Sequence, residues 1–596
     1  MKRMQFGWLV GLLVGFAGVA QANPIVPAND GVGSVVNRVG NQFDITGGTR
    51  AGQNLFHSLL KFGLSQEQIA NFLSQPSIRN ILTRVTGGET SVINGLIKVT
   101  GGNSNLYLLN PAGLVFGPNG RLDIPGSFYG TTANAIKVGD GWFGLSTAPS
   151  ELQRLTGHPG GLAFSSGNQV LNGELAGVIK NEGQLRVPGG ERVVLAGGVV
   201  VNTGTIETPH GQIVVTATPG GRYVEVTPAG SVLSFRLPVA DDAALAAGNL
   251  RPLRLEDVVR LATGSVEVGG SLTTASRVVN PNSRIELVGE RVKLVRGVGL
   301  STEGTEGLMY VRVSPLVPVE QWVFVERFPN FEDVVSSLAP GNQLVLLNRA
   351  DSGVEKVNQA LAGQAGLKGI HVVGDGNRAQ IWFGRDFITP ESLDSYAEQL
   401  AQWGQYLDKD GGIFFYACNL AETAAGKALV DNISKLTGRA VGASTDVTGL
   451  AKYGGNWLLE YGPGGSLPFT VEGISQADVR LLVYTVNDSA DPGPALVAGT
   501  TIYSDGISDD FSGSLRAVIT NANANPSPHR VRFNFNTPTT IQLTLGQIPI
   551  SKDVLFDVAP GKPQVTIKAA LNNRVFEIDA NVIFDGSSSG GIVIQG

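Results

Sequence analysis

The chain contains a single cysteine, Cys418, whose thiol is the candidate nucleophile that the composition offers. A cysteine nucleophile needs a nearby general base, most often a histidine, to become a thiolate. The five histidines are scattered at positions 57, 158, 210, 371 and 529. The sequence shows no P-loop, dinucleotide-binding fingerprint, Cys/His metal cluster or Ser-His-Asp set, so we expect no cofactor and no metal. The alternative for Cys418 is a buried small apolar side chain, and a lone cysteine forms no intrachain disulfide.

The segment around Cys418 alternates between strands and helices. Helices are expected at 351–361, at 421–436 and after a Thr389-Pro390 cap. Apolar runs predict strands at 344–347, 370–373, 380–383, 413–416 and 440–443. This alternation is typical of an α/β sandwich with largely parallel strands, which we assign to residues 330–462.

Five short motifs stand out in this segment: Leu344-Val-Leu-Leu-Asn, Gly369-Ile-His-Val-Val-Gly-Asp-Gly, Phe415-Tyr-Ala-Cys-Asn-Leu-Ala, Ala443-Ser-Thr-Asp-Val-Thr-Gly and Asn456-Trp-Leu-Leu-Glu. With them the segment resembles an uncharacterised family of very large bacterial surface proteins that has a caspase-like character. In that family a Ser-His-Gly step follows the central strand, and a cysteine follows a later strand. The resemblance implies that Cys418 takes the cysteine position and that Asp375, in Gly374-Asp375-Gly376, takes the histidine position.

An aspartate at position 375 predicts a degenerate domain that keeps the fold without the chemistry. Loss of a positioned general base lowers a rate by about 10²–10⁴, and an adjacent carboxylate raises the pKa of a thiol. His371 lies inside the preceding strand, about 13 Å from position 375. We therefore expect no enzyme activity; the alternative is a surface cysteine peptidase that uses Cys418.

The N-terminal part is organised around residues 91–135, where short apolar runs alternate with tight turns. Turns at Asn94-Gly95, Asn110-Pro111 and Pro118-Asn119-Gly120 leave no room for helices between the runs. Strands this short pair by stacking on the coils before and after them, as in a β-solenoid.

An internal repeat supports stacked coils. The pattern that begins at Asn181 recurs at Asn202, 21 residues later, which is about one coil of a three-faced β-helix. We expect Leu185 and Ile206 to stack inside, Asn181 and Asn202 to form an amide ladder, and His210 to occupy a surface turn.

Ordered blocks at 54–58, 91–96, 105–117 and 126–133 resemble the filamentous-haemagglutinin-type secretion domain, the N-terminal domain of exoproteins exported by two-partner secretion. Departures occur at Ala112 and Leu114, where Asn and Ile are common. The resemblance implies a right-handed parallel β-helix over 23–320 and an outer-membrane transporter that recognises it in the periplasm. The residues implied in transporter recognition or folding are Asn54, His57, Asn94, Gly95, Asn105, Asn110, Pro111, Gly113, Phe116, Gly117, Ser127 and Phe128.

Residues 1–22 predict a secretory signal peptide. Lys2-Arg3 precedes an uncharged stretch at 6–19 that is too short to span a membrane, and Ala20-Gln21-Ala22 forms a cleavage site. We expect export by the Sec machinery and cleavage by signal peptidase. At 64–83 the β pattern breaks, and we expect a short helix there that covers the first coil.

The C-terminal part returns to a β pattern. Residues 463–490 are expected to be a linker with a connecting strand. Residues 491–596 resemble the start of β-helices in other bacterial surface proteins, with a short helix whose Leu515, Val518 and Ile519 face the first coil. The chain stops after a few candidate coils, and the sequence leaves open a truncated gene product or a frayed end.

These features together predict a mainly β protein secreted by a Gram-negative cell, extracellular or associated with the cell surface. The net charge of -6 over 596 residues indicates no nucleic-acid partner. From the family we expect an adhesin for cell adhesion that binds a surface glycan or a cell-surface receptor. A β-helical polysaccharide-acting enzyme is a further alternative, although no carboxylate pair stands out.

Overall fold

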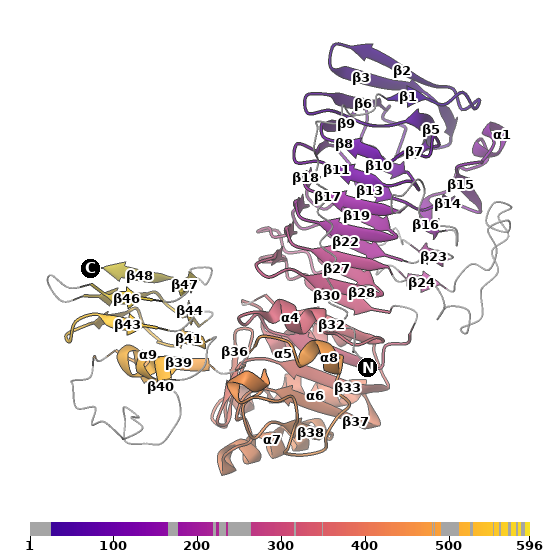
Figure 1. The fold of residues 1–596 in the computed structure, drawn as a ribbon. Helices are drawn as coiled ribbons and strands as arrows, with labels where there is room; N and C mark the ends of the chain where they lie inside the picture. The colour runs from indigo at the N-terminus through magenta and orange to yellow at the C-terminus, as the bar shows by residue number, and fades with distance from the viewer. Residues whose placement is uncertain are drawn as a thin grey trace, which may run out of the picture.

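Three parts follow one another along the chain: an N-terminal parallel β-helix, a middle α/β domain and a C-terminal β-helical segment (Figure 1). The predicted signal peptide lies outside the described residues. No helix among the residues that are described is long and apolar enough to cross a membrane. The computed structural model describes residues 25–164, 177–218, 222–225, 234–236, 264–314, 317–348, 350–479, 481, 483–489, 491, 512–524, 529–551, 554–559, 562–569, 574–579, 582–585 and 591–595.

Three parallel sheets form the faces of the N-terminal β-helix. The first contains β5 (Asn54–Lys61), β7 (Asn80–Val85), β10 (Asn105–Leu109), β13 (Phe128–Thr131), β19 (Arg192–Gly197), β22 (Gln212–Ala217), β27 (Arg284–Gly289) and β30 (Leu308–Val313). The second contains β3 (Gln42–Gly47), β6 (Ile69–Leu73), β9 (Leu96–Thr100), β12 (Arg121–Asp123), β18 (Gln184–Arg186), β21 (Thr205–Glu207), β26 (Ser271–Thr273) and β29 (Gly299–Ser301). The third contains β8 (Ser91–Ile93), β11 (Leu114–Phe116), β17 (Val178–Asn181), β20 (Val199–Asn202), β25 (Ser265–Val268) and β28 (Arg291–Leu294).

The predicted repeat corresponds to successive coils. β18 pairs in parallel with β21, so Leu185 lies over Ile206 with both side chains fully buried. Asn181 donates from Nδ2 to Oδ1 of Asn202 at 2.7 Å, which confirms the amide ladder. His210 lies at a turn with φ 45° and stacks against Gly189 of the previous coil.

The prediction of a helix at 64–83 is wrong. β6 occupies this stretch and pairs in parallel with β3 and β9. Ala70 and Phe72 are both buried on the inner face, so the apolar spacing here serves a strand of the coil. Antiparallel strands cover the end of the β-helix instead: β1 (Val26–Pro27) and β4 (Thr49–Ala51) pair with β5, and β2 (Ser34–Val39) pairs with β3.

A small antiparallel sheet lies against the first face of the β-helix, which the sequence did not predict. Its apolar side packs on residues of that face such as Tyr107 and Val194. The buried Arg84 ties the two together, because it pairs with Asp30 at 2.8 Å and donates to the carbonyls of Gly144 and Thr147. The sheet contains β15 (Gly141–Gly144), β14 (Ala135–Val138), β16 (Pro159–Phe164), β23 (Arg222–Glu225) and β24 (Ser234–Arg236), with α1 (Pro149–Leu152) between β15 and β16.

The middle domain has the predicted strand and helix order. Helices α5 (Gly353–Leu361), α6 (Ala397–Tyr406, after the 3-10 turn η1, Leu393–Tyr396) and α7 (Ala424–Thr437) pack on one face of its sheet. Its parallel strands are β32 (Asn342–Leu346), β31 (Gln321–Val325), β33 (Leu367–Val373), β37 (Leu407–Tyr416) and β38 (Ala440–Ala443), with a small side sheet of β34 (Gly376–Asn377), β35 (Gln380–Phe383) and β36 (Asp386–Ile388).

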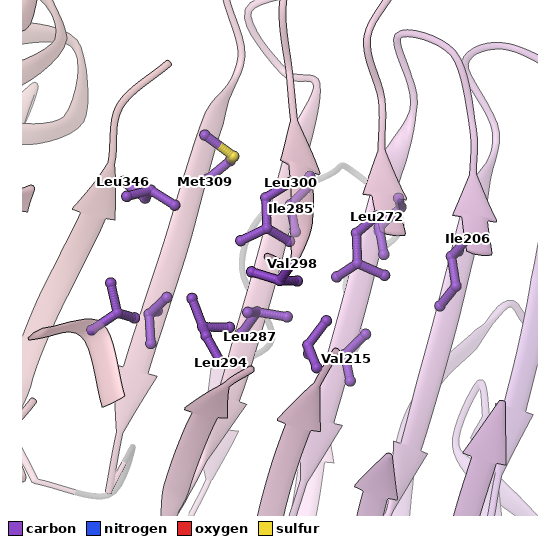
Figure 2. Close-up of a cluster of buried hydrophobic side chains, with 14 of the residues drawn as sticks. Ile206, Val215, Leu272, Ile285, Leu287, Leu294, Val298, Leu300, Met309 and Leu346 are labelled. Atoms are coloured by element: carbon purple, nitrogen blue, oxygen red, sulfur yellow. The ribbon is translucent and has the colours of Figure 1, made fainter. Parts of the chain in front are cut away.

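This domain is joined to the β-helix through its sheet, and its first strand lies before the expected start at residue 330. β30, on the last coil, pairs antiparallel with β32. Leu346 and Val325 belong to the same buried cluster as Met309 and Leu300 of the β-helix, and Figure 2 shows Leu346 beside Met309. Helix α4 (Phe331–Ser336) packs on β28 at the same junction. The β-helix therefore ends against a folded domain.

The stretch predicted as a linker is packed into this core. It contains α8 (Val471–Ile474) and β39 (Val483–Asp488), with η2 (Ala451–Tyr453) shortly before it. Phe469, Ile474, Val479 and Leu481 are buried, because these apolar side chains cover the open face of the middle sheet. The linker prediction is therefore wrong, although the connecting strand is confirmed as β39.

The C-terminal segment forms a second set of parallel coils, as expected. Helix α9 (Leu515–Ala524) buries Leu515, Val518 and Ile519. The prediction that these three side chains point toward the coils is therefore confirmed. The strands are β40 (Ser512–Ser514), β41 (His529–Phe533), β44 (Val554–Val558) and β47 (Val582–Asp585) with β39, then β42 (Thr539–Gln542), β45 (Val565–Lys568) and β48 (Ile592–Gln595), and β43 (Ile548–Ile550) with β46 (Phe576–Ile578).

Candidate functional site

The first group of motif residues forms an asparagine ladder at the start of consecutive strands. Asn80 donates to Asn54 at 2.9 Å, and Asn105 donates to Asn80 at 3.0 Å. Asn54 closes the ladder by donating to the carbonyls of Leu155 and Gly157, each at 2.8 Å. The ladder thus fixes the register of three coils and links them to the connection that precedes β16.

The turn between β10 and β11 is built around Asn110. Its side chain is fully buried, donates to the carbonyl of Glu89 and to Oγ of Ser91 at 2.9 Å each, and accepts from the amide of Ala112 at 3.0 Å. Pro111 is half-buried within this turn. Gly113 has φ 125°, a backbone conformation that side chains disfavour.

The Asn94-Gly95 turn, between β8 and β9, makes its contact with the next coil. Oδ1 of Asn94 accepts from the amide of Asn119 at 3.0 Å. A Cβ at Gly95 would lie 2.3 Å from the carbonyl oxygen of Gln68, and a Cβ at Gly117 would lie 2.5 Å from Oδ1 of Asn94. Both glycines are therefore required for the coils to approach each other.

The remaining motif residues pack between coils. Phe116 and Phe128 are fully buried, with ring centroids 5.9 Å apart in an edge-to-face arrangement. Oγ of Ser127 donates to Glu191 at 2.6 Å and accepts from the amide of Arg192 at 3.0 Å. Because most of the motif is buried, its side chains serve coil formation and offer little direct contact to another protein.

His57 is fully buried in β5 and packs as a structural residue. Its Nδ1 lies 3.3 Å from Oγ of Ser34, and its ring lies 6.0 Å from that of Phe72. Burial lowers the pKa of His57 to about 4. The imidazole is therefore neutral at neutral pH.

We expect the β-helix to lose stability as the pH falls from about 6.5 towards about 4. In this window the unfolded chain protonates His57 and the folded protein does not, so protons favour unfolding. At about 1.4 kcal/mol per pKa unit, the loss amounts to about 3 kcal/mol. Urea unfolding of the full chain at pH 7 and pH 4.5 measures it. The His57→Gln variant should lose less between these pH values than the wild type, and an exposed control, His158→Gln, should not differ from the wild type; equal losses in all three would contradict the assignment.

Cys418 lies directly after β37 and is fully buried. Its Sγ accepts from the amide of Thr448 at 3.2 Å and lies 3.5 Å from the carbonyl oxygen of Thr448. The thiol belongs to the continuous apolar core that runs from the β-helix into the middle domain. This environment is that of a packed residue.

The structure leaves His371 away from a catalytic arrangement. Its ring is fully buried and stacks on Phe414 at 4.8 Å and on Tyr416 at 5.9 Å. Burial lowers the pKa of His371 to about 3, so the ring does not take up a proton near neutral pH. Its Nδ1 lies 3.4 Å from the hydroxyl of Tyr416.

Asp375 takes part in a buried ionic cluster between the middle domain and the C-terminal coils. Arg530 pairs with Asp375, with Glu326 at 3.0 Å and with Asp557 at 2.8 Å. Arg532 pairs with Glu326 at 3.3 Å and Asp557 at 3.0 Å. Desolvation by burial raises the pKa of Glu326, against the pull of the two guanidinium groups, which lowers it.

Arg530, Arg532, Glu326 and Asp557 were not identified from the sequence. The available signal was the His529–Phe533 strand, in which two arginines alternate with apolar residues. Such alternation places both charges on one face, here against Trp382, whose ring lies 4.8 Å from the guanidinium carbon of Arg532. The partners come from positions far apart in the chain, so spacing alone could not name them.

Residues 22–250 match the family described as the TPS secretion domain. This match gives the chain an N-terminal domain of the two-partner secretion type; it supports a secreted exoprotein of that class and implies an outer-membrane transporter as the export partner. Residues 323–477 match a domain of unknown function, DUF4347, a description that assigns no chemistry. The crystal structure of the HMW1 secretion domain from Haemophilus influenzae is similar at 11% identity and a TM-score of 0.28, covering 96% of this chain and 99% of that one. A search of the curated proteins finds no match.

Proposed function

We propose that the outer-membrane transporter recognises the N-terminal β-helix in the periplasm and that the protein acts outside the cell as a non-catalytic adhesin. The observation that carries the first part is the burial of the secretion motif within stacked parallel coils. Because the motif builds coils, the part of the chain that the transporter holds ends in an exposed strand edge. The next strand of the chain can pair with that edge.

Coil addition also supplies a driving force for export. Each new coil pairs its strands in parallel with the preceding coil, as β19 does on β13 and β22 does on β19. Each step closes a short loop, so the entropic cost of adding a coil stays low. Folding outside the cell would then draw out the rest of the chain where no ATP is present.

The non-catalytic part of the proposal rests on the surroundings of Cys418. Asp375 is engaged by Arg530, and the ring of His371 is stacked between aromatic side chains. Neither side chain supplies a general base for the thiol. Adhesion to a surface glycan or a cell-surface receptor is inferred from the family resemblance. Binding of the purified protein to a polysaccharide panel without cleavage would support adhesion; cleavage would favour the polysaccharide-acting enzyme.

Deletion of residues 91–135 with the signal peptide retained should leave the protein in the periplasm. The deletion removes β8 to β13 and the turns at Asn94 and Asn110, so later coils lose the edge on which they stack. Fractionation of cells that carry the transporter measures the result. As a control, Asn103→Ala alters an exposed turn residue of the same segment and should leave release unchanged. Normal release of the deleted protein would sink the proposal.

A further inference from the structure

A cavity of about 320 Å³ lies between the first face of the β-helix and the antiparallel sheet beside it. One wall comes from β7, β10, β13 and the start of β19, and the other wall comes from β14 and β16. The two walls share an apolar cluster, in which Ile136 and Leu162 join Tyr107 (Figure 1). A cavity of this volume is large enough for a small ligand.

Two stacked tyrosines from consecutive coils line the cavity. Tyr107 and Tyr129 are paired in register, and their rings lie 4.1 Å apart at an angle of 6°. Burial, together with the neighbouring Tyr129, raises the pKa of Tyr107 well above its usual value, so its hydroxyl stays neutral. Such rings offer an apolar body with a polar tip, which suits a ligand that has both C–H and hydroxyl groups.

The polar side chains of the lining can both donate and accept hydrogen bonds. Glu191 accepts from Oγ of Ser127 at 2.6 Å, and Asn105 donates one amide hydrogen to Asn80 at 3.0 Å. A carboxylate has about four acceptor sites and an amide nitrogen carries two hydrogens, so each retains capacity for a ligand. Hydroxyl groups, which donate and accept, match this mixture.

The lining also carries two guanidinium groups against one carboxylate. Arg79, directly before β7, has an exposed side chain, and Arg192, at the start of β19, is half-buried. The single carboxylate, that of Glu191, is held by Ser127. Because guanidinium groups bind carboxylates in a bidentate geometry, the charge balance favours a ligand with an anionic substituent.

The strands that line the cavity are already paired on both sides. β10 lies between β7 and β13, and β16 lies between β14 and β23. An extended peptide therefore cannot join these strands by backbone pairing. The cavity suits a compact ligand that is recognised through its substituents.

We propose that this cavity binds an acidic sugar, a pyranose ring that carries a carboxylate, within a surface polysaccharide. The carboxylate lies between Arg79 and Arg192, the hydroxyls bind Glu191 and Asn105, and the ring packs on the tyrosine pair. The inference rests on the proposed adhesion to a surface glycan and adds the class of sugar and its place. A protein that binds neutral polysaccharides but no acidic sugar would keep the adhesion proposal and lose this one.

Titration of the full-length protein with single sugars, followed by saturation-transfer NMR of the sugar protons, tests the ligand class. Glucuronate or galacturonate should bind with a dissociation constant on the order of 1 mM. Glucose and galactose, the matched neutral sugars, should bind at least about tenfold more weakly, because they lack the carboxylate. Failure of both acids to bind, or equal binding of the neutral sugars, would overturn the proposal.

Substitution of the two arginines tests the place of binding. Arg79→Gln and Arg192→Gln should each weaken binding of the acidic sugar about tenfold. The matched control is Arg186→Gln in β18, on the second face of the β-helix, where Arg186 pairs with Glu207 at 3.3 Å. This control should bind as the wild type does. Unchanged binding in Arg79→Gln, or an equal loss in Arg186→Gln, would overturn the proposal; Arg79 is exposed, so its variant decides even if Arg192→Gln does not fold.

Discussion

Replacing Arg530 with methionine should destabilise the junction between the middle domain and the C-terminal coils by about 3–5 kcal/mol. Arg530 is 1% exposed and is the cation shared by Asp375, Glu326 and Asp557. Its removal leaves carboxylates buried with Arg532 as their remaining partner in the cluster. Urea titration of the full chain measures the loss in the free energy of unfolding. Limited proteolysis then measures whether the C-terminal coils have become easier to cleave.

An exposed pair in the same domain provides the control for Arg530. Arg385 pairs with Glu355 at 3.2 Å with both side chains more than half exposed. Arg385→Met should therefore cost no more than about 1 kcal/mol. A double-mutant cycle of Arg530→Met with Asp375→Asn should show coupling of at least about 1 kcal/mol. Additive effects would mean that position 375 plays no part in holding the two parts together.

Truncation of Phe116 to alanine should cost the β-helix about 3–5 kcal/mol and sharply reduce release of the protein. The ring is fully buried between coils against Phe128, and no polar contact can compensate for its loss. The coil that carries the turn at Asn110 and Phe116 then stacks more slowly on the preceding coil, which carries Asn94. The transporter would therefore receive a chain that folds less readily. The fraction of protein outside the cell and the urea midpoint are the two measurements.

Val115 supplies the control for Phe116, because it lies in the same strand with its side chain half-exposed on the outer face. Val115→Ala should leave release close to that of the wild type, and Phe116→Leu should lose less than Phe116→Ala. If Phe116→Ala lowers the stability of the β-helix but is released as well as the wild type, coil packing does not control export. That result would refute the link between the two.

The coils could be predicted because their signal is local. A 21-residue offset places Leu185 on Ile206 and Asn181 on Asn202, and the turns between them carry Gly and Asn at fixed offsets. The strand and helix order of the middle domain was readable for the same reason. The region at 64–83 was misread because Ile69 and Phe72 fit helical spacing, while β3 and β9, which pair with β6 on either side, decide the outcome.

The contacts that give position 375 its role could not be read from the sequence. The resemblance implied a histidine at the position that Asp375 occupies, yet the partner of Asp375, Arg530, lies 155 residues further along the chain. The burial of Leu481 on Cys418 and Gly376 is equally non-local, and a Gly-Pro-Gly-Gly stretch just before it suggested a linker. The antiparallel sheet beside the β-helix was missed because its strands interrupt the coil pattern without a repeat of their own.

A carboxylate at position 375 has a consistent physical meaning in this setting. A neutral histidine at this position would add no counter-charge for Arg530 beside Glu326 and Asp557, whereas an aspartate pairs with it. The carboxylate of Asp375 therefore contributes an ion pair to the junction with the C-terminal coils.

The most direct test of the account is the location of the full-length protein in cells that contain the partner outer-membrane transporter and in matched cells that lack it. The account predicts that the protein reaches the medium or the cell surface when the transporter is present and accumulates in the periplasm when it is absent. Equal release from both kinds of cell would contradict it.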